Sequence, residues 1–260
     1  MNVFENVLLC TDFSSDADHA LEYTLKLAGQ VGSHIHILHV TEPDMPESTE
    51  EVTRLKDELE HKYFDSSEIK HSYLMQEGII EECVNKAVWS NNIDLVILGM
   101  KGLTGEREIL KGSITANLVD KPAAAILGYP GRTNVECVNH ICIAVDKIKK
   151  VDRKAFEMIR ELAKLCGSTV EVFHVQNSEE PPAEPGVEGR LKDFFGELYN
   201  GYREIPGEDV LQITDDYVHD HDIDLLVLFH SNAADQSHHR SMAKRWIFKS
   251  EIPLLILPGH

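Results

Sequence analysis

Apolar and polar positions along the chain alternate between two kinds of pattern. Short unbroken apolar runs, such as NVLLC at residues 6–10 and DLVIL at residues 94–98, are typical of strands that are buried on both faces. Between these runs, residues 17–31 place apolar side chains at helical spacing, and the segment after residue 48 does so again. Strands that alternate with helices predict parallel pairing through right-handed crossovers, and so a doubly wound α/β sheet.

The ends of the first two helices carry their own signals. We place the N-cap of the first helix at Ser15 and its end at Gly32, because serine caps helices and glycine tolerates the left-handed conformation that ends them. Ser48 and Glu51 have the spacing of a capping box and predict the start of the second helix.

The same order of patterns occurs twice. Residues 27–40 (LAGQVGSHIHILHV) match residues 162–175 (LAKLCGSTVEVFHV), and NVLLCTD upstream of the first segment matches HICIAVD upstream of the second. We therefore expect two tandem doubly wound, Rossmann-like domains, each with a five-stranded parallel sheet, at residues 1–134 and 135–260. The Gly- and Pro-containing segment GYPGRTN at residues 128–134 is the expected linker.

Composition and charge narrow the class of protein. The formal net charge of −19 opposes nonspecific binding to nucleic acid or to an anionic membrane, and no run of eighteen apolar residues is present. The N-terminal segment also lacks the basic region of a signal peptide. The five cysteines show no close pairing, which favours free thiols in a reducing compartment. We expect a soluble cytoplasmic protein.

A glycine-containing segment, GMKGLTGEREILKGSIT at residues 99–115, follows the fourth strand. Gly99 and Gly102 would let the backbone come close to a phosphate group. Gly112 and Ser113 indicate a helix start, where free N–H groups and the helix dipole attract anions. The segment therefore favours a phosphate site, and the alternative is a long surface loop that ends in a helix cap.

Two motifs in the first half resemble the universal stress protein family. The spacing Gly-x2-Gly-x9-Gly-Ser is that of its ATP-binding members, and the family's TDFS-like turn is present at residues 11–14. The resemblance extends to the second half by pattern only. It implies a tandem member in which the first half binds ATP, with ADP and AMP as alternatives and magnesium as a further expected ion, and has slow hydrolysis or none.

The same resemblance implies which residues contact the nucleotide. Asp12 would accept hydrogen bonds from the ribose hydroxyls, and Val40 would meet the adenine. A carboxylate at the C-terminal end of a strand suits ribose recognition by its position as well, although an N-cap role for Asp12 is the alternative. The expected nucleotide-binding residues are Cys10, Thr11, Asp12, Val40, Gly99, Met100, Gly102, Gly112, Ser113, Ile114 and Thr115.

The second half departs from this pattern. The segment after its fourth strand, FHSNAADQSHHRSMAKRWIF, contains no glycine, so we expect a degenerate domain that is structural or binds something else. His174, His230 and His238 are candidates for a zinc site in it. The alternative for His174 is a packing role, because His39 occupies the same strand position in the first half.

Three classes of function compete: a nucleotide-binding regulatory or stress-response protein, an enzyme that uses ATP, and a ligand-free module that is structural or binds a partner. The Walker, dinucleotide and kinase motifs and the nucleophile elbow are absent, so we assign no catalytic residues and expect at most a weak ATPase. The resemblance also implies that the final strands of the two halves pair within the chain, as a pseudo-two-fold arrangement. Association of two whole chains into a homodimer is the further alternative.

Overall fold

The computed structural model describes residues 3–43, 46–100, 118, 123–130, 138–145, 153–177, 185–229, 246 and 250–258. The first half contains β1 (Asn6–Cys10), α1 (Ser15–Val31), β2 (His34–Thr41), α2 (Thr49–Tyr63), β3 (His71–Glu77), α3 (Ile80–Asn91), β4 (Leu95–Met100) and β5 (Ala125–Pro130). The second half contains β6 (His140–Val145), α5 (Arg153–Cys166), β7 (Thr169–Gln176), α6 (Val187–Phe195), the 3-10 turn η1 (Gly196–Leu198), β8 (Tyr199–Pro206), α7 (Val210–Asp220), β9 (Leu225–Phe229) and β10 (Leu254–Leu257).

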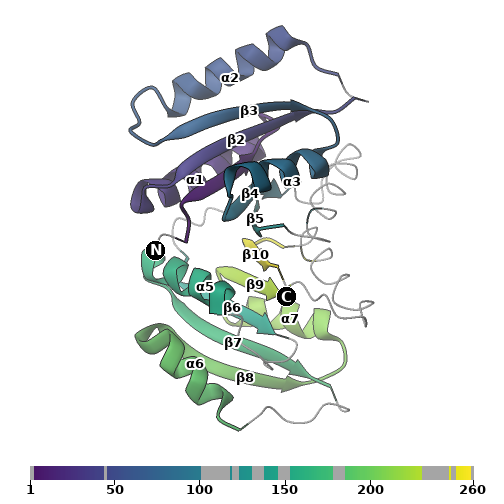
Figure 1. Cartoon of the computed structure of the whole chain (residues 1–260). Helices are drawn as coiled ribbons and strands as arrows, with labels where there is room; N and C mark the ends of the chain where they lie inside the picture. Colours follow the sequence, from purple (N-terminus) through teal and green to yellow (C-terminus); the bar gives the residue numbers. More distant parts are fainter. Residues whose placement is uncertain are drawn as a thin grey trace.

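The ten strands form one continuous sheet in the order β3-β2-β1-β4-β5-β10-β9-β6-β7-β8 (Figure 1). Each half contributes five parallel strands in a doubly wound order, which confirms the expected fold class. The halves meet at β5 and β10, which pair antiparallel with Leu127 opposite Leu255. The strand order reads the same from either edge, so the final strands pair within the chain in a pseudo-two-fold arrangement, as expected.

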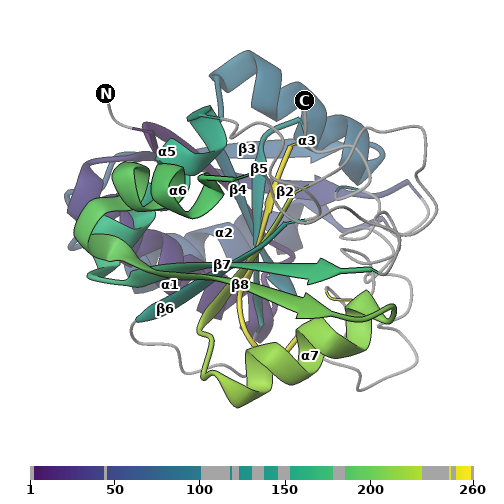
Figure 2. The ribbon, with the colours of Figure 1, turned by 90° about the horizontal axis from the view of Figure 1, so that it is seen from below.

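The central strands of the sheet are buried on both faces, which explains their unbroken apolar runs. Leu9 and Ile97 belong to a core on the side covered by α1 and α5, whereas Leu8 and Leu98 belong to a second core on the side of α3 and α7. Figure 2 shows α5 and α6 on one side of β7 and β8, with α7 on the other. No helix among the described residues has the length and apolar character needed to cross a bilayer.

The helix ends confirm two of three sequence predictions. Gly32 ends α1 with a left-handed φ of 72°, and the Ser48 hydroxyl accepts a hydrogen bond from the Glu51 amide at 3.1 Å. The N-cap of α1 is Ser14 rather than Ser15, because the Ser14 hydroxyl accepts from the backbone amide of Ala17. Two adjacent serines have the same capping chemistry, so the sequence does not separate them.

The linker prediction at residues 128–134 is wrong at its start, because Gly128–Pro130 belong to β5. The glycine has a packing reason there: a Cβ atom at Gly128 would overlap the side-chain sulfur of Met100 on the neighbouring strand. Residues 131–137 lie outside the described part of the chain.

Two stacked imidazoles lie at the start of β2. The ring centroids of His34 and His36 are 4.3 Å apart, and the Ser72 hydroxyl of β3 lies 3.2 Å from His34 Nε2. The same hydroxyl lies 3.1 Å from His36 Nδ1. Burial lowers the pKa of His34, with further lowering by the nearby His71 and Lys70. Burial and the neighbouring His34 lower the pKa of His36.

Acidification is therefore expected to destabilise the protein, and His36→Gln is expected to reduce this sensitivity. A lowered folded-state pKa means that the unfolded chain binds protons more readily, so this stability is complete above the unfolded pKa of about 6.5 and is lost as the pH falls through the folded value. Thermal unfolding at pH 7 and pH 5 measures the effect, with the exposed His19→Gln as the control. Equal losses in wild type and in His36→Gln would show that other groups cause the acid sensitivity.

Candidate functional site

The turn after β1 is held in place by its own side chains. The Thr11 hydroxyl accepts a hydrogen bond from the Phe13 amide at 2.9 Å. Asp12 Oδ1 accepts from the Ser14 amide at 3.1 Å and also from the Ser14 hydroxyl. Asp12 is therefore not the N-cap of α1, as one alternative held, but orients the serine that is. Its carboxylate stays at the C-terminal end of β1, between β2 and β4, which is where doubly wound sheets bind ligands.

Phe13, in the same turn, adopts a left-handed backbone with φ of 56°. This conformation costs a non-glycine residue about 1–2 kcal/mol, so the surroundings must hold it. The ring of Phe13 packs against the ring of His39, with centroids 4.7 Å apart. Strained turns of this kind gather at ligand sites, and this turn carries the candidate ribose carboxylate.

His39 ties the turn to the chain that follows β2. The side chain is 3% exposed, Nδ1 lies 3.0 Å from the Thr11 carbonyl oxygen, and Nε2 lies 2.7 Å from Glu47 Oε2. The second half repeats the first of these contacts, because His174 Nδ1 lies 2.9 Å from the Val145 carbonyl oxygen. Sequence reasoning gave His174 as a zinc candidate, with a packing role like that of His39 as the alternative, and it missed these polar contacts. Their repetition at matched strand positions was the available signal.

An apolar surface lies beside Asp12 on the α3 side of the sheet. Cys10 and Val40 are partly buried there, together with Leu74 of β3 and Ile80 of α3, and all four pack against the core on that side. Burial raises the pKa of the Cys10 thiol to about 12, so it stays neutral and acts as an apolar contact. The structure thus brings Cys10, Val40 and Asp12, three of the predicted nucleotide-binding residues, to one edge of the sheet.

The end of β4 contains two further predicted residues. Met100 is 2% exposed and its side chain packs over Gly128, so this side chain is not available to a ligand. Gly99 lies inside β4, in register with Tyr129 of β5, so an extended strand rather than a turn surrounds it. Five predicted residues lie outside the described part of the chain: Gly102, Gly112, Ser113, Ile114 and Thr115.

The second half places a phenylalanine where the first half has Gly99. Cys10 is in register with Leu98 in the first half, and Ala144 with Leu228 in the second, so Phe229 is the residue equivalent to Gly99. Its ring stacks on Phe156 of α5 with centroids 5.6 Å apart, and Phe156 also contacts Phe194 and Phe195. The second half therefore has an aromatic cluster, on the α5 side of the sheet, at the strand position where the first half has Gly99.

The candidate zinc ligands receive no support from the described residues. Within that part of the chain, no group of three or more histidine, cysteine, aspartate or glutamate side chains could hold a metal ion. His174 Nδ1 makes a hydrogen bond with the backbone carbonyl oxygen of Val145. His230 and His238 lie outside the described residues.

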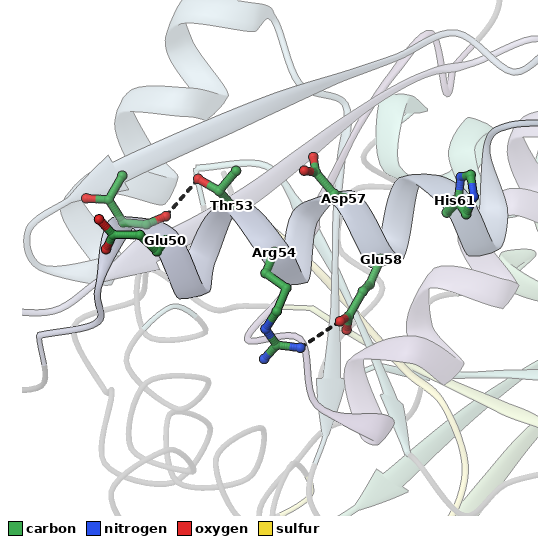
Figure 3. A pocket seen from close by; sticks show the side chains of 7 residues that line it. Glu50, Thr53, Arg54, Asp57, Glu58 and His61 are labelled. Atoms are coloured by element: carbon green, nitrogen blue, oxygen red, sulfur yellow. Dashed lines mark hydrogen bonds and ion pairs between the residues drawn. The ribbon is translucent and has the colours of Figure 1, made fainter.

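A shallow hollow on the outer face of α2 is shown in Figure 3. Its described lining comes from that one helix, and the side chains point in different directions rather than toward a common centre. Arg54 forms an ion pair with Glu58 at 2.6 Å, so its guanidinium group stabilises α2 by a contact within the helix. We assign no ligand site to this hollow. Its lining residues are Thr49, Glu50, Thr53, Arg54, Asp57, Glu58 and His61.

Comparison with known proteins places the first half in a family. Residues 4–125 match the model of the universal stress protein family. Universal stress protein MJ0577 of Methanocaldococcus jannaschii is 23% identical over 152 residues, which cover 48% of this chain and 94% of that protein. Residues 4–125 therefore belong to the universal stress protein family, as the two sequence motifs indicated.

Solved structures extend the likeness of fold to the whole chain. A universal stress protein from Archaeoglobus fulgidus has a TM-score of 0.76 at 18% identity, and the match covers 99% of this chain and 98% of that one. A functionally unknown protein, PA1789 from Pseudomonas aeruginosa, has a TM-score of 0.65 at 15% identity, covering 98% and 93%. At this identity the likeness shows the fold alone.

Proposed function

We propose that the first half binds an adenine nucleotide and that the protein is a nucleotide-dependent regulator of a stress response rather than an enzyme. The observation that carries the proposal is the carboxylate of Asp12, which a preformed turn holds at the switch point of the sheet. ATP is the first candidate, with ADP and AMP as alternatives. We take residues 1–134 and 135–260 as the two domains and the cytoplasm as the location.

Each part of a nucleotide has a matching surface in this proposal. The adenine packs on the apolar edge around Cys10 and Val40, and the ribose hydroxyls donate to Asp12. The phosphates follow the backbone from Gly99 toward Gly112, where the dipole of the helix that the sequence predicts would offset part of the repulsion from a net charge of −19. A magnesium ion would take the phosphate oxygens as its main ligands, as it does at most nucleotide sites.

The second domain has a structural role in this proposal. Phe229 stands where the first half has Gly99, and the segment that follows it contains no glycine, which favours one nucleotide per chain over two. A ligand-free partner-binding module is the second candidate for the protein as a whole, and the same experiment separates the two.

Denaturing the purified protein and chromatographing the released small molecules tests the proposal. We expect close to one adenine nucleotide per chain, with a parallel metal assay reporting magnesium. Empty protein that is then titrated with ATP provides the second arm, and saturation at one site per chain is expected there. No released nucleotide and no binding in the titration would leave the partner-binding module as the better description.

A further inference from the structure

We propose that His39 couples the nucleotide crevice to the start of α2, so that nucleotide binding is transmitted to the first turn of that helix. The inference rests on the proposed function, because the turn that His39 holds contains Asp12. The inference identifies His39 as a positioning residue and gives a route by which bound nucleotide could affect α2. The proposed function identifies only the ligand.

His39 makes two contacts that carry the coupling, one from each nitrogen of its imidazole. The contact with Thr11 is the first end of the coupling, and the contact with Glu47 is the second end. Nδ1 faces the Thr11 carbonyl oxygen at 3.0 Å, and a carbonyl can only accept, so this nitrogen carries a proton. Nε2 faces Glu47 Oε2 at 2.7 Å, a contact that needs a second proton, carried by the ring or by the carboxyl group. The ring is almost completely buried, whereas the Glu47 side chain is 36% exposed, so the hydrogen bond of Nδ1 is shielded from water and that of Nε2 is shielded on the histidine side only.

Glu47 places the second end at a helix start. It directly precedes Ser48, whose hydroxyl accepts from the Glu51 amide and whose carbonyl accepts from the Val52 amide at 3.1 Å. Thr41, at the end of β2, also lies 3.5 Å from the same carboxylate oxygen of Glu47. A movement of Glu47 is therefore passed directly to the next residue, Ser48, which is the N-cap of α2.

The first end lies in the part of the site that a nucleotide would disturb. A ribose bound to Asp12 pulls on a turn that already contains the left-handed Phe13, and the ring of that residue rests on His39. A ligand shifts a conformational equilibrium only through contacts that differ between the two states. In the proposal, the His39–Glu47 hydrogen bond is closed when the turn has its binding conformation, as in this structure, and opens when the turn leaves that conformation, and this supplies the difference.

The chain offers matched variants. Glu47→Ala removes the second end. Glu47→Gln restores it, because the amide N–H can donate to an unprotonated Nε2 while Nδ1 still donates to Thr11. His174→Gln is the control, since His174 makes the corresponding carbonyl contact in the half that has Phe229 in place of Gly99. None of the three changes touches the proposed ligand directly.

Amide hydrogen exchange at Glu51 and Val52, with and without ATP, measures the coupling in the full chain, and calorimetric titration with ATP measures affinity. In wild type and His174→Gln we expect ATP to slow exchange at both amides several-fold. In Glu47→Ala we expect this protection to disappear and ATP affinity to fall about tenfold, the size of one lost hydrogen bond to a charged group. Glu47→Gln should recover most of both effects.

Two outcomes overturn the inference, and they are distinguishable from each other. If wild type binds ATP but exchange at Glu51 and Val52 does not respond, or responds equally in Glu47→Ala, the coupling is wrong and the nucleotide site stands. If wild type does not bind ATP in the titration, the proposed function fails and the coupling fails with it.

Discussion

Asp12→Asn is expected to weaken ATP binding by roughly ten- to a hundredfold while leaving the melting temperature close to that of the wild type. The structure separates two roles of this side chain. One oxygen supports the turn by accepting from the amide and hydroxyl of Ser14, and asparagine retains such an oxygen. The negative charge strengthens hydrogen bonds from the ribose hydroxyls, each worth about 1.5–3 kcal/mol, and asparagine lacks it. Calorimetric titration and thermal unfolding measure the two roles.

Two further variants complete this test. Asp12→Ala removes both roles, so it should lose affinity at least as strongly and also lower the melting temperature. Ser14→Ala keeps the carboxylate but removes the N-cap of α1, which typically costs about 1 kcal/mol of stability. The ribose assignment would be refuted by an Asp12→Asn variant that binds ATP as tightly as wild type, or by a Ser14→Ala variant that loses as much affinity as Asp12→Asn.

The fold could be predicted from the sequence because its signals are local and repeated. Strands buried on both faces must be apolar throughout, and the duplication shows each such run twice. The position of Asp12 follows from the same logic, since the carboxyl ends of parallel strands meet at one edge of the sheet. The linker prediction failed because Gly128 and Pro130 have the composition of a loop. Gly128 instead makes room for the side chain of Met100 inside a buried strand.

The details of the site depend on contacts that no local pattern contains. The left-handed conformation of Phe13 is unfavourable for its residue type, and it exists because Thr11 and His39 hold it in place. The His39–Glu47 contact joins a strand to the segment before the next helix. Its geometry follows from the folded arrangement rather than from sequence spacing. Phe229 was visible in the sequence as a missing glycine, but its partner Phe156 became apparent only in the structure.

Gly99→Phe is expected to abolish ATP binding, with a loss of at least a hundredfold, in a protein that still folds. The second half shows that the fold accepts this side chain, because Phe229 occupies the equivalent strand position and packs on Phe156 of α5. In the first half, the same ring would fill the space through which a phosphate approaches the backbone of β4. Gly99→Ala is the graded control, with a smaller loss expected. Titration with ATP measures both variants, and circular dichroism checks the fold.

The reverse change, Phe229→Gly, tests whether the aromatic ring alone closes the second crevice. We expect no second nucleotide site, because the second half also lacks the later glycines of the motif. We do expect a loss of about 3 kcal/mol in the free energy of unfolding, since a ring packed in an aromatic cluster is removed and leaves a cavity. Urea denaturation and ATP titration measure the two effects. Binding of a second ATP by this variant would show that the two halves differ in one side chain rather than in a whole loop. Unchanged binding by Gly99→Phe would mean that the phosphates do not pass β4 at all.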